Sequence, residues 1–234
     1  MVLDVAISNN GRYMFVADRD EKIRVSRYPE AFVIQSFCLG HSAYVSSIAV
    51  KGDRLFSSGG DGFVHEWDAE SGTSVAQSQK LGEEPIRRIR ICKNDNKICL
   101  AAITRSALTL LDEKLTIMKS FSTPDSLMDI TPFKEHIIGV SSNGVVLFNL
   151  SDEISHSVQV PTELLQLLAK SKDPIPSYFK NVTHQNMLDY YKRKAEKIES
   201  TKENQIRKRK ARQSRKAAAK LKKIANEPEV TAAC

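Results

Sequence analysis

The first 160 residues contain short stretches in which apolar and polar side chains alternate, separated by clusters of turn-forming residues. Alternation with a period of two is typical of β-strands that bury one face, and frequent turns favour antiparallel neighbours. The pattern therefore predicts a series of short antiparallel strands. They span residues 3–7, 13–17, 23–27, 32–38, 45–50, 55–58, 63–68, 73–79, 86–91, 98–103, 107–111, 116–121, 127–131, 136–140 and 144–149.

The predicted strands group into four units with a period near forty residues, at about 1–40, 41–82, 83–123 and 124–160. A repeat of about this length with up to four short strands per unit is typical of a β-propeller, in which each unit is one blade. We therefore expect residues 1–160 to form an all-β partial propeller of about four blades.

Four polar residues of the second unit would be costly inside an apolar sheet. His41 precedes the first strand, Ser57 lies in the second, Asp61 in the tight turn and Trp67 in the third. A buried polar group without a partner costs about 1–3 kcal/mol, so we expect these side chains to hydrogen bond to one another. With the dipeptides at 40–41 and 67–68, the stretch resembles the WD-repeat family, in which such a relay holds a blade together without any catalytic role.

A seven-bladed propeller needs on the order of 280–300 residues at about forty per blade. The chain has 234 residues, and only 160 of them carry the repeat. We therefore expect about four WD-repeat blades of a seven-bladed parent, that is, the C-terminal half of a longer chain.

After residue 160 the pattern changes to helical. Thr162 is placed to cap a short helix, residues 172–176 form a Pro-containing break, and Thr183 is placed to cap a long helix from about 184 to 225. We expect residues 161–180 to be a short helix and linker, and 181–234 a basic helical tail. An apolar stripe on the long helix favours docking within the chain, with docking on a partner as the alternative; it comprises Met187, Leu188, Tyr190, Tyr191, Ala195 and Ile198.

The net charge of +7 is concentrated in this tail. Residues 181–234 hold fifteen Lys/Arg against six Asp/Glu, whereas the first 180 residues hold 20 against 22. Such asymmetry indicates an acidic partner such as nucleic acid, or a nuclear import signal. The cationic residues singled out are Arg207, Lys208, Arg209, Lys210, Arg212, Arg215 and Lys216. RNA backbone contact, nuclear import and a solvated helix all fit, and no aromatic residues interleave the run to support base stacking.

No motif of the sequence carries catalytic chemistry. It has no Gly-rich phosphate loop, no helical pair of metal-binding histidines and no nucleophile motif at a strand-to-helix turn. The five histidines are scattered, so no metal site is expected, and the four cysteines lack a C-x-x-C pair and fit a reducing compartment. No apolar run approaches the roughly 18 residues of a membrane span, so we expect neither an enzyme nor a membrane partner.

The segment DRDEKIRVS, residues 18–26, is the second candidate for an interaction. Strand alternation places Lys22 and Arg24 on one face and Ile23 and Val25 on the other. From the pattern alone, a solvated blade edge is the favoured interpretation.

A more specific resemblance is carried by this block together with residues 2–6 and the segment FCLGH at 37–41. These runs closely resemble the non-catalytic, Wuho-like WD-repeat subunit of eukaryotic tRNA (guanine-N7)-methyltransferases. The similarity covers the first two units well and the others loosely. The tail is similar in character, with Tyr178 and Phe179 preceding a basic helix that contains Tyr190 and Tyr191.

This resemblance implies a nuclear heterodimer, present also in the cytoplasm, in which the chain binds no cofactor. S-adenosylmethionine belongs to the catalytic partner, which forms 7-methylguanosine in the tRNA variable loop, and tRNA is met through the complex. Lys22 and Arg24, with Arg19 in the same block, become candidates for binding an acidic patch on that partner. The alternative is a nuclear WD-repeat scaffold in another RNA-related assembly, in ribosome biogenesis or translational repression.

Overall fold

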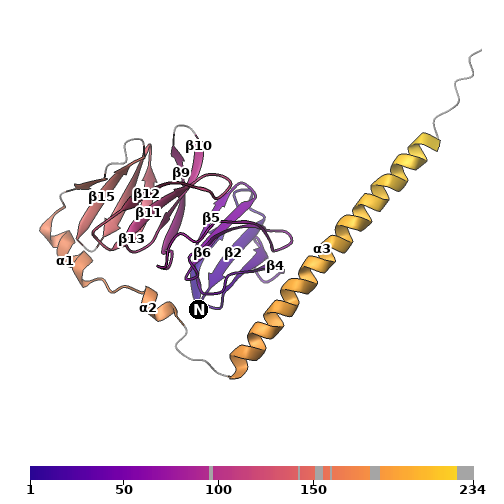
Figure 1. Cartoon of the computed structure of the whole chain (residues 1–234), viewed down its shortest axis with the longest axis horizontal. Coiled ribbons are helices and arrows are strands. Elements are labelled where there is room, and N and C mark those ends of the chain that lie inside the picture. The colour runs from indigo at the N-terminus through magenta and orange to yellow at the C-terminus, as the bar shows by residue number, and fades with distance from the viewer. Residues whose placement is uncertain (95–96, 142, 151–154, 159, 180–184, 226–234) are drawn as a thin grey trace, which may run out of the picture. The chain divides into compact units, whose positions relative to one another are not determined.

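The computed structural model describes residues 1–94, 97–141, 143–150, 155–158, 160–179 and 185–225. The chain forms two compact units, Met1–Thr183 and His184–Cys234, and each is described by itself. The first contains every strand of the described residues, and the second contains one long helix, α3 (Gln185–Ala225) (Figure 1).

The first unit consists of four antiparallel sheets of four strands each, and within each sheet the strands follow one another in chain order. Blade one is β1 (Val2–Ile7), β2 (Tyr13–Asp18), β3 (Lys22–Arg27) and β4 (Ile34–Leu39). Blade two is β5 (Val45–Lys51), β6 (Arg54–Gly59), β7 (Val64–Asp68) and β8 (Thr73–Gln77). Blade three is β9 (Arg88–Asn94), β10 (Lys97–Ile103), β11 (Ala107–Leu111) and β12 (Ile117–Ser122). Blade four is β13 (Leu127–Phe133), β14 (His136–Ser141), β15 (Gly144–Asn149) and β16 (Ser155–Val158).

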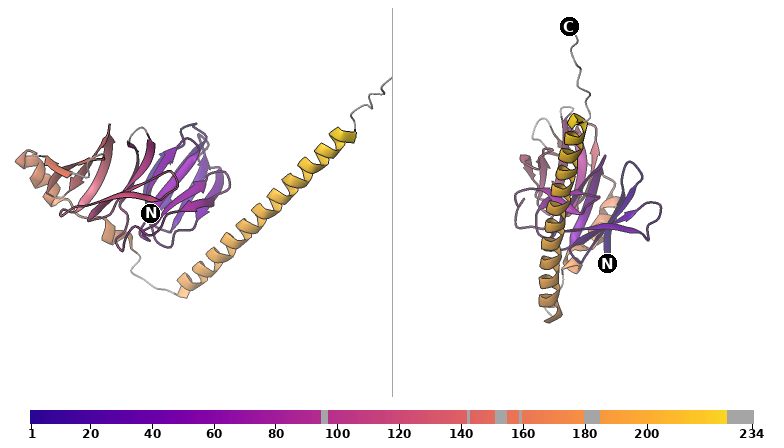
Figure 2. Two further views of the ribbon diagram at one scale, coloured as in Figure 1. Left: turned by 45° about the horizontal axis from the view of Figure 1, so that its top comes forward. Right: turned by 90° about the vertical axis from the view of Figure 1, so that its right-hand side faces the viewer.

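The blades stack face to face through their first strands. β1 packs against β5, β5 against β9, and β9 against β13, so the first strand of each sheet lies on the inner side of the array. Figure 2 shows the sheets following one another side by side, each twisted relative to the next. The expected all-β propeller architecture with about four blades is confirmed.

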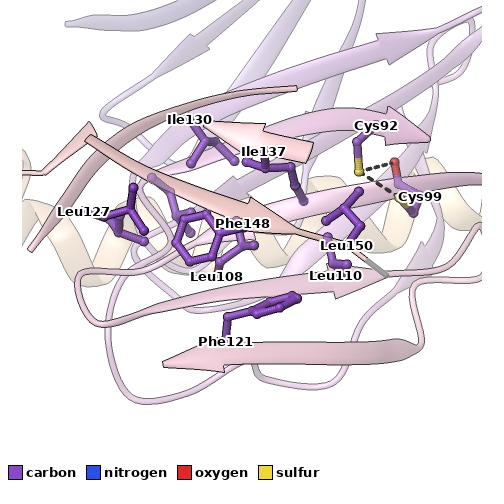
Figure 3. Packing of buried hydrophobic residues seen from close by; sticks show 13 residues of the cluster. Cys92, Cys99, Leu108, Leu110, Phe121, Leu127, Ile130, Ile137, Phe148 and Leu150 are labelled. Carbon is purple, nitrogen blue, oxygen red and sulfur yellow. Dashed lines mark hydrogen bonds between the residues drawn. The ribbon is translucent and has the colours of Figure 1, made fainter. Parts of the chain in front are cut away.

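The hydrophobic core lies between the blades rather than within one layer. Phe15 and Ile23 of blade one pack with Leu55 and Trp67 of blade two, and further clusters join blades two and three and blades three and four. In the last cluster Phe121 and Phe148 meet edge to face with ring centroids 5.7 Å apart (Figure 3). Each large apolar side chain buried in this way stabilises the fold by about 1.5–3 kcal/mol. This gain explains why apolar residues recur at every second position of the strands, on the face that packs against the next blade.

Several predicted strand limits differ from the structure. The strand expected from residue 32 begins at Ile34, leaving Phe32 85% exposed in the preceding turn. The strand expected from residue 86 begins at Arg88, because the Ile86 amide donates to Gly59 O of blade two. β16 was not predicted, since its sequence SHSV carries almost no apolar alternation.

The C-terminal part of the first unit also needs correction. The first helix, α1 (Thr162–Lys170), begins at the predicted residue, but Pro161 occupies the N-cap and no side chain caps the helix. The predicted break at 172–176 contains the start of a short helix, α2 (Ile175–Tyr178), which tolerates Pro176 in its first turn. The predicted cap Thr183 lies outside the described residues. No helix among the described residues is both long and apolar enough to span a membrane.

Candidate partner-binding surface and its supports

The structure brings together the four polar residues of the second blade. Trp67 Nε1 donates to Ser57 Oγ at 2.7 Å, Ser57 Oγ lies 2.8 Å from His41 Nε2, and His41 Nδ1 lies 2.7 Å from Asp61 Oδ2. All four side chains are almost completely buried. The relay joins the loop before β5 to β6, to the β6–β7 turn and to β7, and so fixes the shape of the blade.

A fifth polar residue, His65, lies beside this relay and was not singled out in the sequence. Its ring stacks on Trp67 at 5.2 Å and meets His41 edge to face at 4.4 Å. Both of its ring nitrogens are buried without a hydrogen-bond partner among the described residues. Burial, with the neighbouring His41, lowers the pKa of His65 to about 3, although Asp61 opposes the shift.

Asp61 is the acidic end of the relay. Burial raises the pKa of its carboxyl, but the hydrogen bond and charge of His41 and the amides of Ser42 and Phe63 outweigh it and hold the pKa below its ordinary value. His41, Asp61 and His65 place one potential metal ligand each within 4.8 Å of one another. Because both ring nitrogens of His41 are engaged by Asp61 and Ser57, the arrangement serves the blade rather than an ion.

The predicted interaction block forms the β2–β3 turn and strand β3 of the first blade. The Asp18 carboxylate accepts the amide of Asp20 at 2.7 Å and lies 3.5 Å from Lys22 Nζ, so it holds the turn and partly neutralises Lys22. Arg24 is exposed and makes no ion pair with any described residue. Lys22 and Arg24 therefore present positive charge on one face of an open blade, while Ile23 and Val25 are buried on the other.

Arg19 of the same block has a contact within the chain. Its guanidinium donates from Nε to Tyr178 O at 3.2 Å and from Nη2 to Phe179 O at 3.0 Å. The rings of Tyr178 and Phe179 both pack edge to face on Tyr44, with centroids 5.3 and 5.0 Å away. Arg19 thus ties residues 171–179, named here the anchoring segment, to the first two blades.

A partly buried ion pair fixes the other end of the anchoring segment. Arg87 contacts Asp173 through two hydrogen bonds, Nη1 to Oδ1 at 3.2 Å and Nη2 to Oδ2 at 2.5 Å. The Arg87 side chain is only 7% exposed, whereas Asp173 is 39% exposed. Sequence reasoning missed this pair and the packing on Tyr44, because nothing local links residues that lie 86 positions apart.

The anchoring segment explains the path of the chain after the fourth blade. α1 contacts β15 of that blade, and the chain then returns along the sheets to the first blade (Figure 1). The segment ends at Phe179, whose carbonyl accepts a hydrogen bond from Arg19. Arg19 lies three positions before Lys22 in the sequence. Phe179, the last residue of the anchoring segment, therefore lies next to the block that carries Lys22 and Arg24.

The tail is described separately. Arg207, Lys208, Arg209, Lys210 and Arg212 are exposed along α3, as expected from their sequence. Arg215 and Lys216 belong to the same helix, but their side chains lie outside the described residues. Leu188 and Tyr191 of the apolar stripe are 68% and 43% exposed.

Comparison with known proteins now identifies the family. The model of the tRNA methyltransferase TRM82 WD40 domain matches residues 1–119. The chain is 36% identical over 219 residues to the tRNA (guanine-N(7)-)-methyltransferase non-catalytic subunit of Caenorhabditis elegans, which covers 91% of the chain and 55% of that relative. This chain belongs to the TRM82 WD40 family.

Other members of the TRM82 WD40 family match shorter stretches at higher identity. The non-catalytic subunit wdr4 of Danio rerio is 51% identical over 75 residues, covering 31% of the chain and 18% of that protein. Human WDR4, a non-catalytic subunit of the same name, is 49% identical over 78 residues, covering 32% of the chain and 19% of that protein. The chain thus spans about half the length of the worm relative, and all three relatives are named as non-catalytic subunits.

Proposed function

We propose that this chain is a non-catalytic accessory subunit of a tRNA (guanine-N7)-methyltransferase. The observation that carries the proposal is the similarity to the worm non-catalytic subunit, which extends over 91% of the chain and so includes both the propeller and much of the tail. The chain would stabilise and orient a catalytic subunit that binds S-adenosylmethionine and forms 7-methylguanosine in the tRNA variable loop. The chain itself would bind no cofactor.

Lys22 and Arg24 are the residues we propose for the heterodimer contact. Arg24 is the better donor, since it is exposed and makes no ion pair with a described residue, whereas Lys22 already lies 3.5 Å from Asp18. An exposed ion pair contributes only about 0–1 kcal/mol. Lys22 and Arg24 therefore add to the affinity for the partner only if they face an acidic patch that loses its water on binding. Arg19 would act indirectly, because its guanidinium is engaged by the anchoring segment.

The basic tail is the proposed contact to tRNA and the proposed nuclear import signal. Residues 207–212 place five cations within two turns of α3, which suits phosphate contacts spread around a helix but not base recognition. We accordingly propose a nuclear location, with a further cytoplasmic pool. Imaging of a fluorescent fusion tests it: replacing Arg207, Lys208, Arg209 and Lys210 by Gln should shift the protein out of the nucleus.

The function is tested by measuring 7-methylguanosine formation in tRNA by a purified catalytic subunit, with and without this chain, at near-physiological salt. We expect stimulation by the wild type and a loss of about tenfold or more in stimulation for Lys22→Glu combined with Arg24→Glu, because two attractive contacts become repulsive. The full-length C. elegans relative serves as the positive control. Absence of stimulation by this chain where that relative stimulates its own partner would overturn the proposal.

A matched control is available on the third blade. Lys93 and Lys114 are both exposed, and neither makes an ion pair with a described residue. Lys93→Glu combined with Lys114→Glu changes the net charge equally but on a different blade. If this control pair lost stimulation as completely as the first-blade pair, general electrostatics rather than a docking surface would be responsible.

The alternative function is a nuclear WD-repeat scaffold that contacts RNA in another assembly. It is favoured by one observation, namely that the basic helix forms a compact unit of its own. The positive charge of this helix comes from its own Lys and Arg residues, so contact with RNA would not require a catalytic subunit. Under this alternative, neutralising residues 207–210 abolishes RNA binding, whereas reversing the charges of Lys22 and Arg24 leaves RNA binding unchanged.

A further inference from the structure

A cavity of about 490 Å³ lies in the first unit, on the side of the propeller that the anchoring segment covers. Its walls come from the beginnings of three inner strands, through Ser46 of β5, Arg88 of β9 and Met128 of β13, and from the loop after β10, through Arg105. Residues 171–175 and Tyr178 form the remaining wall. Ligand sites commonly have volumes of about 300–1,000 Å³, so the space suits a ligand much larger than a single ion.

The lining carries an excess of positive charge. Four cations line the cavity, Arg87, Arg88, Arg105 and Lys172, against the single carboxylate of Asp173. Asp173 is engaged by Arg87, and Arg88 lies 3.9 Å from Asp4 and 3.7 Å from Asp129, which also pairs with Arg90. Arg105 and Lys172 make no ion pair with any described residue, so their charges remain available.

The cavity is held open by contacts within the fold. The two-point ion pair of Arg87 with Asp173 fixes the anchoring segment, and Asp173 Oδ1 also accepts the amide of Ile175 at 3.1 Å. On the opposite wall Ser46 Oγ donates to Ile86 O at 2.6 Å and is 4% exposed as a residue. A site whose walls are already ordered loses less entropy on binding than one that must form around its ligand.

We propose that this cavity binds the phosphate group of a nucleotide-sized ligand. Arginine recognises phosphate because its planar guanidinium donates several hydrogen bonds in a geometry that matches the phosphate oxygens. Arg105 and Lys172 both line this cavity, and neither makes an ion pair with a described residue. Ile175 and Tyr178 line the same space and supply apolar surface for a sugar or a base. A lone inorganic phosphate would leave most of the volume unfilled.

The phosphate has two sources, a free nucleotide or a nucleotide unit of an RNA chain. In the second case the inference rests on the proposed function, and tRNA is the RNA that the assembly supplies. Recognition would then occur in the propeller itself, separately from the tail, and would add to the nonspecific attraction of α3 for the backbone.

The test uses the full chain and two double variants. Arg105→Gln with Lys172→Gln removes the unpaired cations of the cavity, and Lys93→Gln with Lys114→Gln removes two exposed cations elsewhere on the propeller. Guanosine 5′-monophosphate binding is measured by saturation-transfer NMR with inorganic phosphate as competitor. Binding of a tRNA transcript is measured by fluorescence anisotropy over a salt series. Thermal unfolding verifies that both variants remain folded.

We expect the cavity variant to bind guanosine 5′-monophosphate about tenfold more weakly than the wild type and the control variant do. Inorganic phosphate should compete with the nucleotide for binding to the wild type and to the control variant. If RNA is the source, the cavity variant also loses about one to two from the slope of log K against log[salt], roughly one for each phosphate contact. A change in mononucleotide binding alone assigns the cavity to free nucleotides. Equal binding of both ligands by the two variants overturns the proposal.

The outcome is independent of the test of the proposed function. If methylation is stimulated normally by the cavity variant while nucleotide binding is lost, the accessory role stands and the cavity serves another purpose. If nucleotide binding is intact but no stimulation is seen with the wild type, the accessory role fails and the cavity inference stands.

Discussion

At the scale of single residues, the second blade depends on polar groups that satisfy one another inside an apolar core. Ser57 is the central member, because its hydroxyl contacts both Trp67 Nε1 and His41 Nε2. Its neighbour Ser58 is equally buried, yet the Ser58 hydroxyl has no hydrogen-bond partner among the described residues. Two adjacent serines thus differ only in what their side chains contact.

This difference gives a stability prediction. Ser57→Ala leaves a buried indole N–H without its acceptor, and we expect the free energy of unfolding to fall by about 2–3 kcal/mol. Ser58→Ala removes a buried hydroxyl that has no described partner, so we expect a change within about 0.5 kcal/mol or a slight stabilisation. Urea unfolding followed by Trp67 fluorescence measures both. Equal losses would mean that the relay contributes no more than packing.

His65 gives a prediction about pH. Its folded-state pKa, about 3, lies below the ordinary value of 6.5, so the unfolded chain binds a proton that the folded chain excludes. Stability linked to His65 is therefore fully present above pH 6.5 and is lost as the pH falls from 6.5 towards 3, by up to about 1.4 kcal/mol per pH unit. Asp61 does not obscure this between pH 5 and 6.5, because its lowered pKa acts below the ordinary carboxyl value of 3.8.

We expect His65→Phe to flatten the dependence of unfolding free energy on pH between 5 and 6.5, since the ring stack on Trp67 survives without a titrating group. His156, an exposed histidine of β16, supplies the control. His156→Gln should leave the slope unchanged. A slope retained in His65→Phe would assign the proton uptake to another group.

At the scale of elements, the anchoring segment is the feature that organises the candidate surface. Neither α1 nor α2 has a buried residue, so the segment is held mainly by the Arg87–Asp173 pair, by Arg19 and by the rings on Tyr44. Gly59 permits the loop before β5 to come close, because a Cβ there would lie 1.9 Å from Tyr44 O. A few tertiary contacts therefore hold residues 171–179 against the propeller.

Removing one of these contacts should release the segment locally. Asp173→Ala leaves the nearly buried Arg87 unpaired, and we expect a loss of about 1–3 kcal/mol and faster hydrogen exchange in residues 171–179, with the blades unaffected. Glu83→Ala breaks the exposed pair with Lys80 and should cost no more than about 0.5 kcal/mol. Unchanged exchange of the segment in Asp173→Ala would show that the rings on Tyr44 suffice to hold it.

At the scale of the whole molecule, the chain combines a nearly neutral propeller with a strongly basic helix in a separate compact unit. The single tryptophan of the chain, Trp67, is buried in blade two and reports only on the first unit. Helix α3 has 41 residues. Within its own unit, the helix is stabilised by local hydrogen bonds and side-chain pairs.

The two units should therefore unfold separately. We expect circular dichroism at 222 nm to fall gradually from low temperature as α3 melts, while Trp67 fluorescence changes in one later, cooperative step. A chain that ends at residue 183 should retain the fluorescence transition within about 0.5 kcal/mol and lose the gradual phase. Coincident transitions in the full chain would contradict the division into two units.

The sequence by itself determined the repeat, the positions of most strands, the members of the relay and the uneven distribution of charge. These features are local, since strand alternation and turn residues act over a few positions and a WD-type blade contains all four relay residues within 41–67. The block with Lys22 and Arg24 was also found in this way, because alternation along β3 decides which side chains face out.

Only the tertiary structure decided which of these residues are free to act. It engaged Arg19 with the anchoring segment, joined Arg87 to Asp173 across 86 positions, and brought the unpaired Arg105 of blade three and Lys172 of the anchoring segment to one cavity. No local pattern records such contacts, because they join blade residues to the anchoring segment, which lies far from them in the sequence. The physical reason is that blade packing, rather than sequence proximity, sets the distances between these side chains.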